Sequence, residues 1–157
     1  MATEIERKFL VKNESWRSDA DGGTPIRQGY IVGGAAATVR VRLSGERAWL
    51  SIKSATVGVT RGEFNYEIPC ADAACILETL CTGTTIEKVR FVVRYAGHDW
   101  EIDVFEGEND GLVLAEIELQ SEGEAFERPA WAGKEVSDDP RYYNSALAEC
   151  PYRRWKR

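Results

Sequence analysis

The chain has 157 residues, of which 43% are hydrophobic and 29% are charged, and its formal net charge is −6. This length suits one domain with a buried core, and the composition is typical of a soluble globular protein. The acidic balance argues against nucleic-acid binding through a general positive field, and no apolar run approaches the roughly 18 residues of a membrane helix. We therefore expect a single domain over 1–157 with no nucleic-acid or membrane partner. Because the N-terminus has no signal-peptide core, we expect a cytoplasmic protein.

Strand signals dominate the first two-thirds of the chain. Several segments alternate apolar and polar residues, which is typical of half-buried strands. They cover residues 4–11, 26–32, 37–43, 48–54, 62–69, 87–95, 100–107 and 112–120. Short turns rich in Gly and Asp separate several of them. About eight strands at this spacing predict a barrel or a sandwich.

Helical signals are fewer. A short helix is predicted over 13–19, a clearer one over 72–81, and a last one over 139–150 between two prolines. Another is predicted to start in 121–131, where Pro129 limits its length. The expected fold class is α+β and mainly β.

The polar faces of the strands are almost wholly ionised. Arg40 and Arg42 share one face of their strand, and Glu116 and Glu118 share one face of another. The ordinary interpretation of such alternation is a sheet with one solvated face. Here, however, some strands are basic and others acidic, and like charges two residues apart repel unless an opposite charge lies between them. If these faces line a barrel, the interior needs an anion for the basic strands and a cation for the acidic ones.

A phosphate chain with Mg²⁺ meets both needs. Carboxylates are ligands for Mg²⁺ and Mn²⁺, and an arginine binds phosphate oxygens through two parallel hydrogen bonds. Other chemistry is poorly supported: the four cysteines form no CxxC pair and His98 is the only histidine, which argues against a zinc site or a Ser-His-Asp triad.

The ordered motifs resemble those of CYTH domains, the triphosphate tunnel metalloenzymes. Glu4, Glu6 and Lys8 match the opening ExExK signature, and the likeness continues through VRVRL, SIK, RGEFNYEIP, KVR, WEIDVFEG, AEIEL and GKEVSDDPRYYNSAL. The resemblance implies an eight-stranded antiparallel closed barrel, or tunnel, with a few helices packed outside. It also implies a bound triphosphate and a divalent cofactor, Mg²⁺ or Mn²⁺.

The resemblance further implies roles for individual residues. The implied metal ligands are Glu4, Glu6, Glu63, Glu67, Asp103, Glu116 and Glu118. The implied phosphate-binding residues are Lys8, Arg40, Arg42, Lys53, Lys88 and Arg90. The implied catalytic residues are Glu4, Glu6, Lys8, Tyr30, Lys53, Glu63 and Asp103. Asn65 departs from the pattern, because relatives often have an acidic residue there.

Among the activities of the family, the resemblance favours that of compact bacterial members, which hydrolyse inorganic triphosphate to diphosphate and phosphate. No insertion or aromatic-rich loop is dedicated to a base and ribose. The alternatives are a class IV adenylyl cyclase, another nucleotide or thiamine triphosphatase, and a polyphosphate-binding module without activity. A lipocalin-like barrel with no phosphate role is disfavoured by the ionised faces. The oligomeric state stays open between a monomer and a homodimer.

Overall fold

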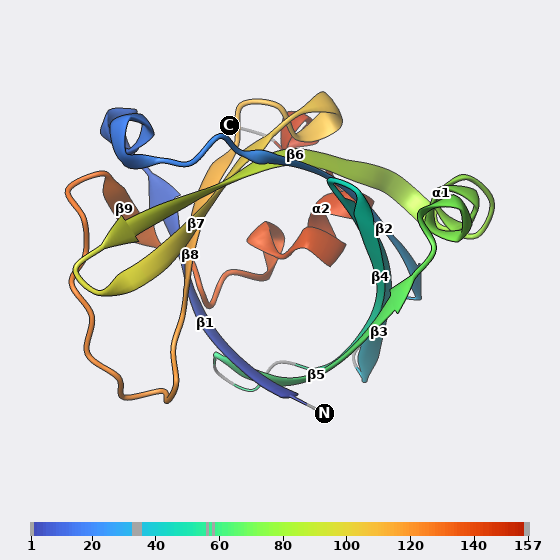
Figure 1. Ribbon diagram of the computed structural model, residues 1–157, viewed down its shortest axis with the longest axis horizontal. Coiled ribbons are helices and arrows are strands. Elements are labelled where there is room, and N and C mark those ends of the chain that lie inside the picture. Colours follow the sequence, from blue (N-terminus) through green and yellow to red (C-terminus); the bar gives the residue numbers. More distant parts are fainter. Residues whose placement is uncertain (1, 33–35, 56, 58, 156–157) are drawn as a thin grey trace.

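The computed structural model describes residues 2–32, 36–55, 57 and 59–155. Its antiparallel strands form a closed ring. The strands are β1 (Ala2–Val11), β2 (Thr24–Val32), β3 (Ala37–Ser44), β4 (Arg47–Ser54), β5 (Thr60–Ile68), β6 (Thr82–Tyr95), β7 (His98–Phe105), β8 (Val113–Glu118) and β9 (Ala132–Glu135). They pair in the order β5-β4-β3-β2-β6-β7-β8-β1, and β5 pairs back to β1 to close the ring (Figure 1). The predicted eight-stranded closed barrel is confirmed.

The first strand has three partners. One edge of β1 pairs with β8, from Glu6 to Leu10. The other edge pairs with β5 over Ala2–Ile5 and then with β9 through Phe9 and Val11. The strand β9, which the sequence did not predict, therefore lies beside the barrel and is not part of the ring.

The helix α1 (Cys70–Thr79) lies outside the barrel, as expected (Figure 1). It packs Ala73 and Leu77 against Val41 and Ala48, which lie on the outer face of β3 and β4. This contact explains why the predicted segment forms a helix, since its apolar side covers one part of the barrel wall.

The helix α2 (Asn144–Glu149) differs from the expectation, because it lies within the ring of strands at one end (Figure 1). Its residues Leu147 and Ala148 pack with Ile86, Phe105 and Leu114, which face the interior. The prediction that the helices pack outside is therefore wrong for α2. One end of the barrel has an apolar filling, and the charged part of the interior begins next to it.

A second apolar layer covers the outside of β1, β6, β7 and β8. Trp16, in the short helix η1 (Ser15–Asp19), packs against Phe91, and Trp131 packs against Trp100 in this layer. The other short 3₁₀ helices are η2 (Gly107–Asn109), η3 (Pro140–Tyr142) and η4 (Tyr152–Arg154). No helix among the described residues has both the length and the apolar character needed to cross a membrane.

The prediction of a helix starting in 121–131 is wrong. These residues form turns and extended chain. Glu124 explains the difference: it accepts a hydrogen bond from the backbone N–H of Gln120, at 2.6 Å, and contacts His98 Nε2, also at 2.6 Å. The Glu124 side chain therefore anchors the segment to His98, the first residue of β7.

Candidate active site

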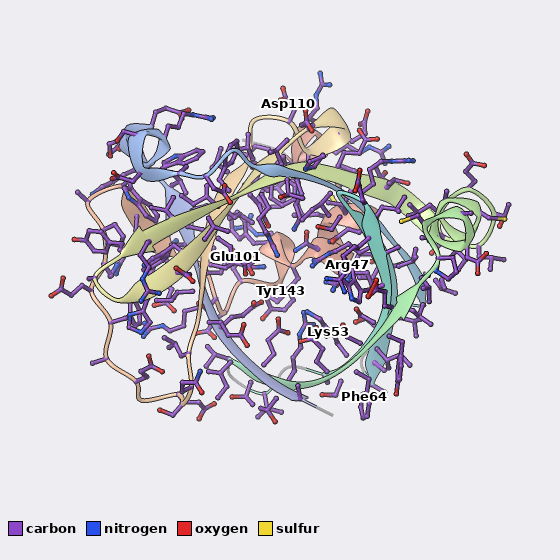
Figure 2. All side chains as sticks on the ribbon, in the orientation of Figure 1. Arg47, Lys53, Phe64, Glu101, Asp110 and Tyr143 are labelled. Carbon is purple, nitrogen blue, oxygen red and sulfur yellow. The ribbon has the colours of Figure 1, made fainter. Side chains whose placement is uncertain are left out.

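The strand register brings the charged faces together inside the barrel. Lys8 lies opposite Glu116, and Lys53 lies opposite Glu63. Because directly paired residues point to the same face of a sheet, these side chains meet in the interior. Figure 2 shows Lys53 and Tyr143 inside the ring and Phe64 outside it.

A polar cavity occupies the open part of the interior. Its charged lining residues are Glu4, Glu6, Lys8, Arg40, Arg42, Lys53, Arg61, Glu63, Arg90, Glu101, Glu116 and Glu118. Its other lining residues are Tyr30, Thr38, Val59, Ser137, Tyr143, Asn144 and Ser145. Most of the site residues predicted from the sequence are therefore brought to one place.

The basic wall is formed by Arg40 and Arg42 on β3. Arg42 Nε donates to Gln28 Oε1 at 2.8 Å, and Arg40 Nη2 lies 3.4 Å from Ser51 Oγ. Within the described residues neither guanidinium forms an ion pair, and Arg40 Nε is buried without a hydrogen-bond partner. Burial, and then the charges of Arg40 and Arg90, lowers the pKa of Arg42 to about 9. These are the properties of a site that needs an anion.

The acidic wall is formed by β1 and β8. Glu4 is paired, with Lys53 Nζ at 2.9 Å and Arg61 Nε at 3.3 Å. Burial raises the pKa of Glu4, but the charge and hydrogen bond of Lys53 and the charge of Arg61 outweigh it, so the pKa is lowered. Glu116 lies 3.4 Å from Lys8 Nζ. Burial opposes ionisation there too, and the charge of Lys8 prevails, so the pKa of Glu116 falls to about 2.

Two carboxylates of this wall lack a partner. Glu6 and Glu118, paired across β1 and β8, form no ion pair or hydrogen bond through their side chains in the described part of the chain. Burial, followed by the charges of Glu116 and Glu4, raises the pKa of Glu6 well above its usual range. Burial and the charge of Glu4 also raise the pKa of Glu118.

This wall fits a divalent cation by donor type and by charge. Carboxylate oxygens are the ligands that Mg²⁺ and Mn²⁺ prefer, and a cation would relieve the repulsion that raises the pKa of Glu6. Among the described residues, however, no group of three Asp, Glu, His or Cys side chains is placed to hold an ion, so these carboxylates do not converge on one point.

Asp103 and Lys88 are buried and do not line the cavity. Asp103 accepts hydrogen bonds from Lys88 Nζ at 2.7 Å and from Arg90 Nε and Nη2 at 2.8 and 2.9 Å. Burial acts against the charge of Asp103, but Arg90 and Lys88 outweigh it and lower the pKa. Lys88 also donates to Asn144 of α2. The two residues form a buried support that fixes Arg90, which does reach the cavity.

Glu67 is also separated from the other predicted ligands. It lies near the end of β5, where its half-exposed carboxylate pairs with Arg47 Nη2 at 2.5 Å. The alternation along β5 is as predicted, but the strand continues past the charged cavity.

Several lining residues were absent from the predicted site. Glu101 has the inward alternation of its strand, which indicates its direction, but it matches the family motif too weakly to receive a role. Arg61 has the inward alternation of β5, so the pattern could have found it. Tyr143, Asn144 and Ser145 precede or begin α2, and only the position of that segment inside the barrel brings them to the cavity.

Comparison with known proteins agrees with this geometry. The sequence profile of the CYTH domain matches residues 2–143. The chain belongs to the CYTH family. Among similar CYTH proteins, an inorganic triphosphatase of Acetivibrio thermocellus is 46% identical over 156 residues, covering 99% of each chain.

Two further comparisons cover nearly the whole CYTH chain. An inorganic triphosphatase of Nitrosomonas europaea is 37% identical over 153 residues, which are 93% of this chain and 97% of the relative. A crystal structure of an inorganic triphosphatase superposes with a TM-score of 0.67 at 35% identity, covering 94% of this chain and 95% of the other. The predicted family is confirmed.

Proposed function

We propose that this CYTH protein hydrolyses inorganic triphosphate to diphosphate and phosphate. The observation that carries the proposal is the buried Arg40 beside the half-buried Arg42, in a cavity whose other wall carries Glu6 and Glu118. Among the described residues the two arginines have no acidic partner, and the two glutamates have no basic one. A triphosphate and a divalent cation supply both missing charges. The names of the two full-length relatives support the same substrate.

The phosphate-binding residues of this proposal are Lys8, Arg40, Arg42, Lys53 and Arg90. Each lines the cavity, and charge-assisted hydrogen bonds from such groups to phosphate oxygens are short and strong. Lys88 is left out of direct binding, because it is buried and contacts Asp103 and Asn144.

We assign the cation, Mg²⁺ or Mn²⁺, to Glu4, Glu6, Glu116 and Glu118, with Glu63 nearby. Bound there, it would neutralise phosphate charge and lower the pKa of a water molecule. Asp103 and Glu67 are not included, because Asp103 already accepts three hydrogen bonds and Glu67 pairs with Arg47.

The remaining roles are to orient the attacking water and to stabilise the charge that develops during the reaction. Lys8 and Arg90 stabilise the charge that develops on the leaving diphosphate. Glu63 orients the attacking water. Tyr30 lies opposite Arg40 across β2 and β3 and is retained as a catalytic residue on the strength of its place in the lining.

The experiment is a product analysis with tripolyphosphate and Mg²⁺. We expect phosphate and diphosphate in equal amounts, no turnover in EDTA, and a large loss of kcat/KM in Arg42→Ala. Arg27→Ala is the matched control, since Arg27 lies on the outer face of β2 next to Glu87. Binding without turnover would indicate a polyphosphate-binding module instead.

The same assay with ATP separates the enzymatic alternatives. Cyclic AMP with diphosphate would identify an adenylyl cyclase, and a kcat/KM for ATP or thiamine triphosphate equal to that for tripolyphosphate would contradict the proposed substrate. The cytoplasmic location, the single-domain organisation and the choice between monomer and homodimer stay predictions from the sequence.

A further inference from the structure

A chain of hydrogen bonds crosses three strands of the barrel wall and ends at Glu63. Arg40 on β3 lies opposite Ser51 on β4, which lies opposite Asn65 on β5. The three side chains therefore form a row across the sheet, on its inner face.

The donors in this row all point the same way. Arg40 Nη2 donates to Ser51 Oγ at 3.4 Å, and Ser51 Oγ donates to Asn65 Oδ1. Asn65 Nδ2 then donates to Glu63 Oε1 at 2.7 Å. A hydroxyl has a single proton, so a Ser51 that accepts from Arg40 directs its proton to Asn65. The amide oxygen is thereby occupied, and the amide N–H group faces Glu63.

An ionised acidic residue at position 65 could not donate a hydrogen bond to Glu63. A carboxylate accepts hydrogen bonds and does not donate when ionised, and it would place a second negative charge beside Glu63.

The contact selects one oxygen of Glu63. Asn65 and, more distantly, Lys53 Nζ at 3.9 Å both approach Oε1. No hydrogen bond or ion pair in the described residues uses Oε2. The carboxylate of Glu63 is therefore held through Oε1, while Oε2 has no partner among the described residues.

We propose that Asn65 is a positioning residue, oriented by Ser51, that fixes the rotamer of Glu63 for catalysis. This inference rests on the proposed function, because Glu63 acts there on water and next to the cation. Asn65 itself does not line the polar cavity, so its role is to orient Glu63, which does.

A double-mutant cycle tests the proposal. Asn65→Ala should lower kcat for tripolyphosphate about tenfold, with a change in KM of less than about threefold, since the loss falls on orientation and not on phosphate binding. In a Glu63→Gln background the same change should cost little more, because residues that act as a unit are not additive. Tyr66→Phe, on the outer face of β5, is the control and should leave kcat unchanged.

Two further measurements separate positioning from folding. Ser51→Ala should lower kcat in the same direction as Asn65→Ala, and Ser51→Thr, which keeps the hydroxyl, should restore it. Calorimetric titration with Mn²⁺ alone should show severalfold weaker binding in Asn65→Ala than in the parent, and no further weakening when Glu63→Gln is already present. The melting temperature of each variant reports its folding.

The proposal would be overturned by an unchanged kcat in Asn65→Ala or by an effect confined to KM. It would also be overturned if the losses of kcat in Asn65→Ala and Glu63→Gln were additive. Failure of the proposed function is a different result: the parent would release no phosphate from tripolyphosphate.

Discussion

Arg42 shows at the scale of one residue how the site opposes the stability of the fold. Its guanidinium is half-buried beside Arg40 and Arg90, and in the described residues its hydrogen bond goes to the neutral Gln28. A buried charge without a counter-charge costs free energy, which only an anionic ligand would return.

We predict that Arg42→Met stabilises the free protein and weakens substrate binding. The folded-state pKa, about 9, lies below the ordinary value of 12.5, so the cost of the charge is present at every pH below 9 and fades as the pH rises above it. At pH 7 the free energy of unfolding should rise by about 1–3 kcal/mol, and KM should rise about tenfold or more. Denaturant unfolding and steady-state kinetics measure the two effects. The exposed Arg27→Met should change neither, and a destabilised Arg42→Met would contradict the argument.

Asp103 is the opposite case, a buried charge with two cationic partners. Its pKa is lowered in the folded state, so its contribution to stability is present above the ordinary pKa of 3.8 and is lost as the pH falls below that value. Removing the charge at neutral pH would leave Lys88 and Arg90 uncompensated.

We predict that Asp103→Asn lowers the free energy of unfolding by about 3–5 kcal/mol at pH 7. The difference from the parent should narrow as the pH drops below 4, because the parent then loses the same contribution. Urea unfolding from pH 2 to 7 gives the comparison. Asp99→Asn, which breaks the exposed pair with Arg94, is the control. A difference that did not depend on pH would show that the ion pairs are not its source.

The sequence could predict which residues face inward, but not all of what they contact. Alternation placed Glu6, Arg42 and Glu116 correctly, because period two follows from the geometry of any strand. Asp103 and Glu67 also have the predicted alternation, yet one is covered by Arg90 and Lys88 and the other lies beyond the cavity. Such differences depend on depth along the barrel, which a local pattern does not contain.

At the scale of elements, the predicted strands follow the observed ones to within a few residues except at β6. This strand begins at Thr82, before the predicted start at residue 87, because Thr82 and Ile86 pair with β2. The local sequence there is rich in Thr and Gly and shows no apolar alternation. The short β9 was missed for a related reason: its pairing with β1 is a tertiary contact that its four residues do not signal.

The helix α2 was predicted as part of a longer helix, and its position inside the barrel was not. Tertiary packing decides the position, since Leu147 fills the space between Ile86 and Leu114. This position also requires α2 to approach the backbone of β6 closely. Gly83 has φ +73°, and a Cβ there would lie 2.7 Å from the carbonyl oxygen of Ala148.

We predict that Gly83→Ala destabilises the protein more than Gly97→Ala does. Both glycines have positive φ, but a Cβ at Gly97 would meet nothing within 4 Å. Gly97→Ala should therefore show the backbone strain alone, about 1 kcal/mol, and Gly83→Ala the strain plus displacement of α2. Chemical unfolding measures the difference, and KM should also change in Gly83→Ala because Asn144 and Ser145 line the cavity. Equal losses in the two variants would mean that α2 does not need this contact.

At the scale of the whole molecule, the empty barrel has like charges side by side on each wall. Basic residues are neighbours on β3, and acidic residues face one another across β1 and β8. In the proposed function triphosphate and a divalent cation neutralise different walls, so each should favour the binding of the other.

We predict that tripolyphosphate and Mg²⁺ together raise the melting temperature by more than the sum of their separate effects. A ligand that binds only the folded state stabilises it by about 2.7 kcal/mol at a hundredfold excess over Kd. A thermal melt with each component alone and with both measures the coupling, and monophosphate at equal ionic strength is the control. Strictly additive shifts would mean that the two walls bind their ligands independently.

The three partners of β1 have a consequence for how the chain folds. The strand β1 precedes its partners β5, β8 and β9 in the chain, so its hydrogen bonds are completed only by residues up to Glu135. Ring closure thus joins segments far apart in sequence, and such contacts slow folding because loop entropy is lost before they form. Until then β1 exposes unpaired N–H and C=O groups, which makes the nascent chain prone to pair with other chains. Charged side chains on an unpaired edge oppose such pairing, and in β1 they are Glu4, Glu6 and Lys8, the residues that we assign to ligand binding.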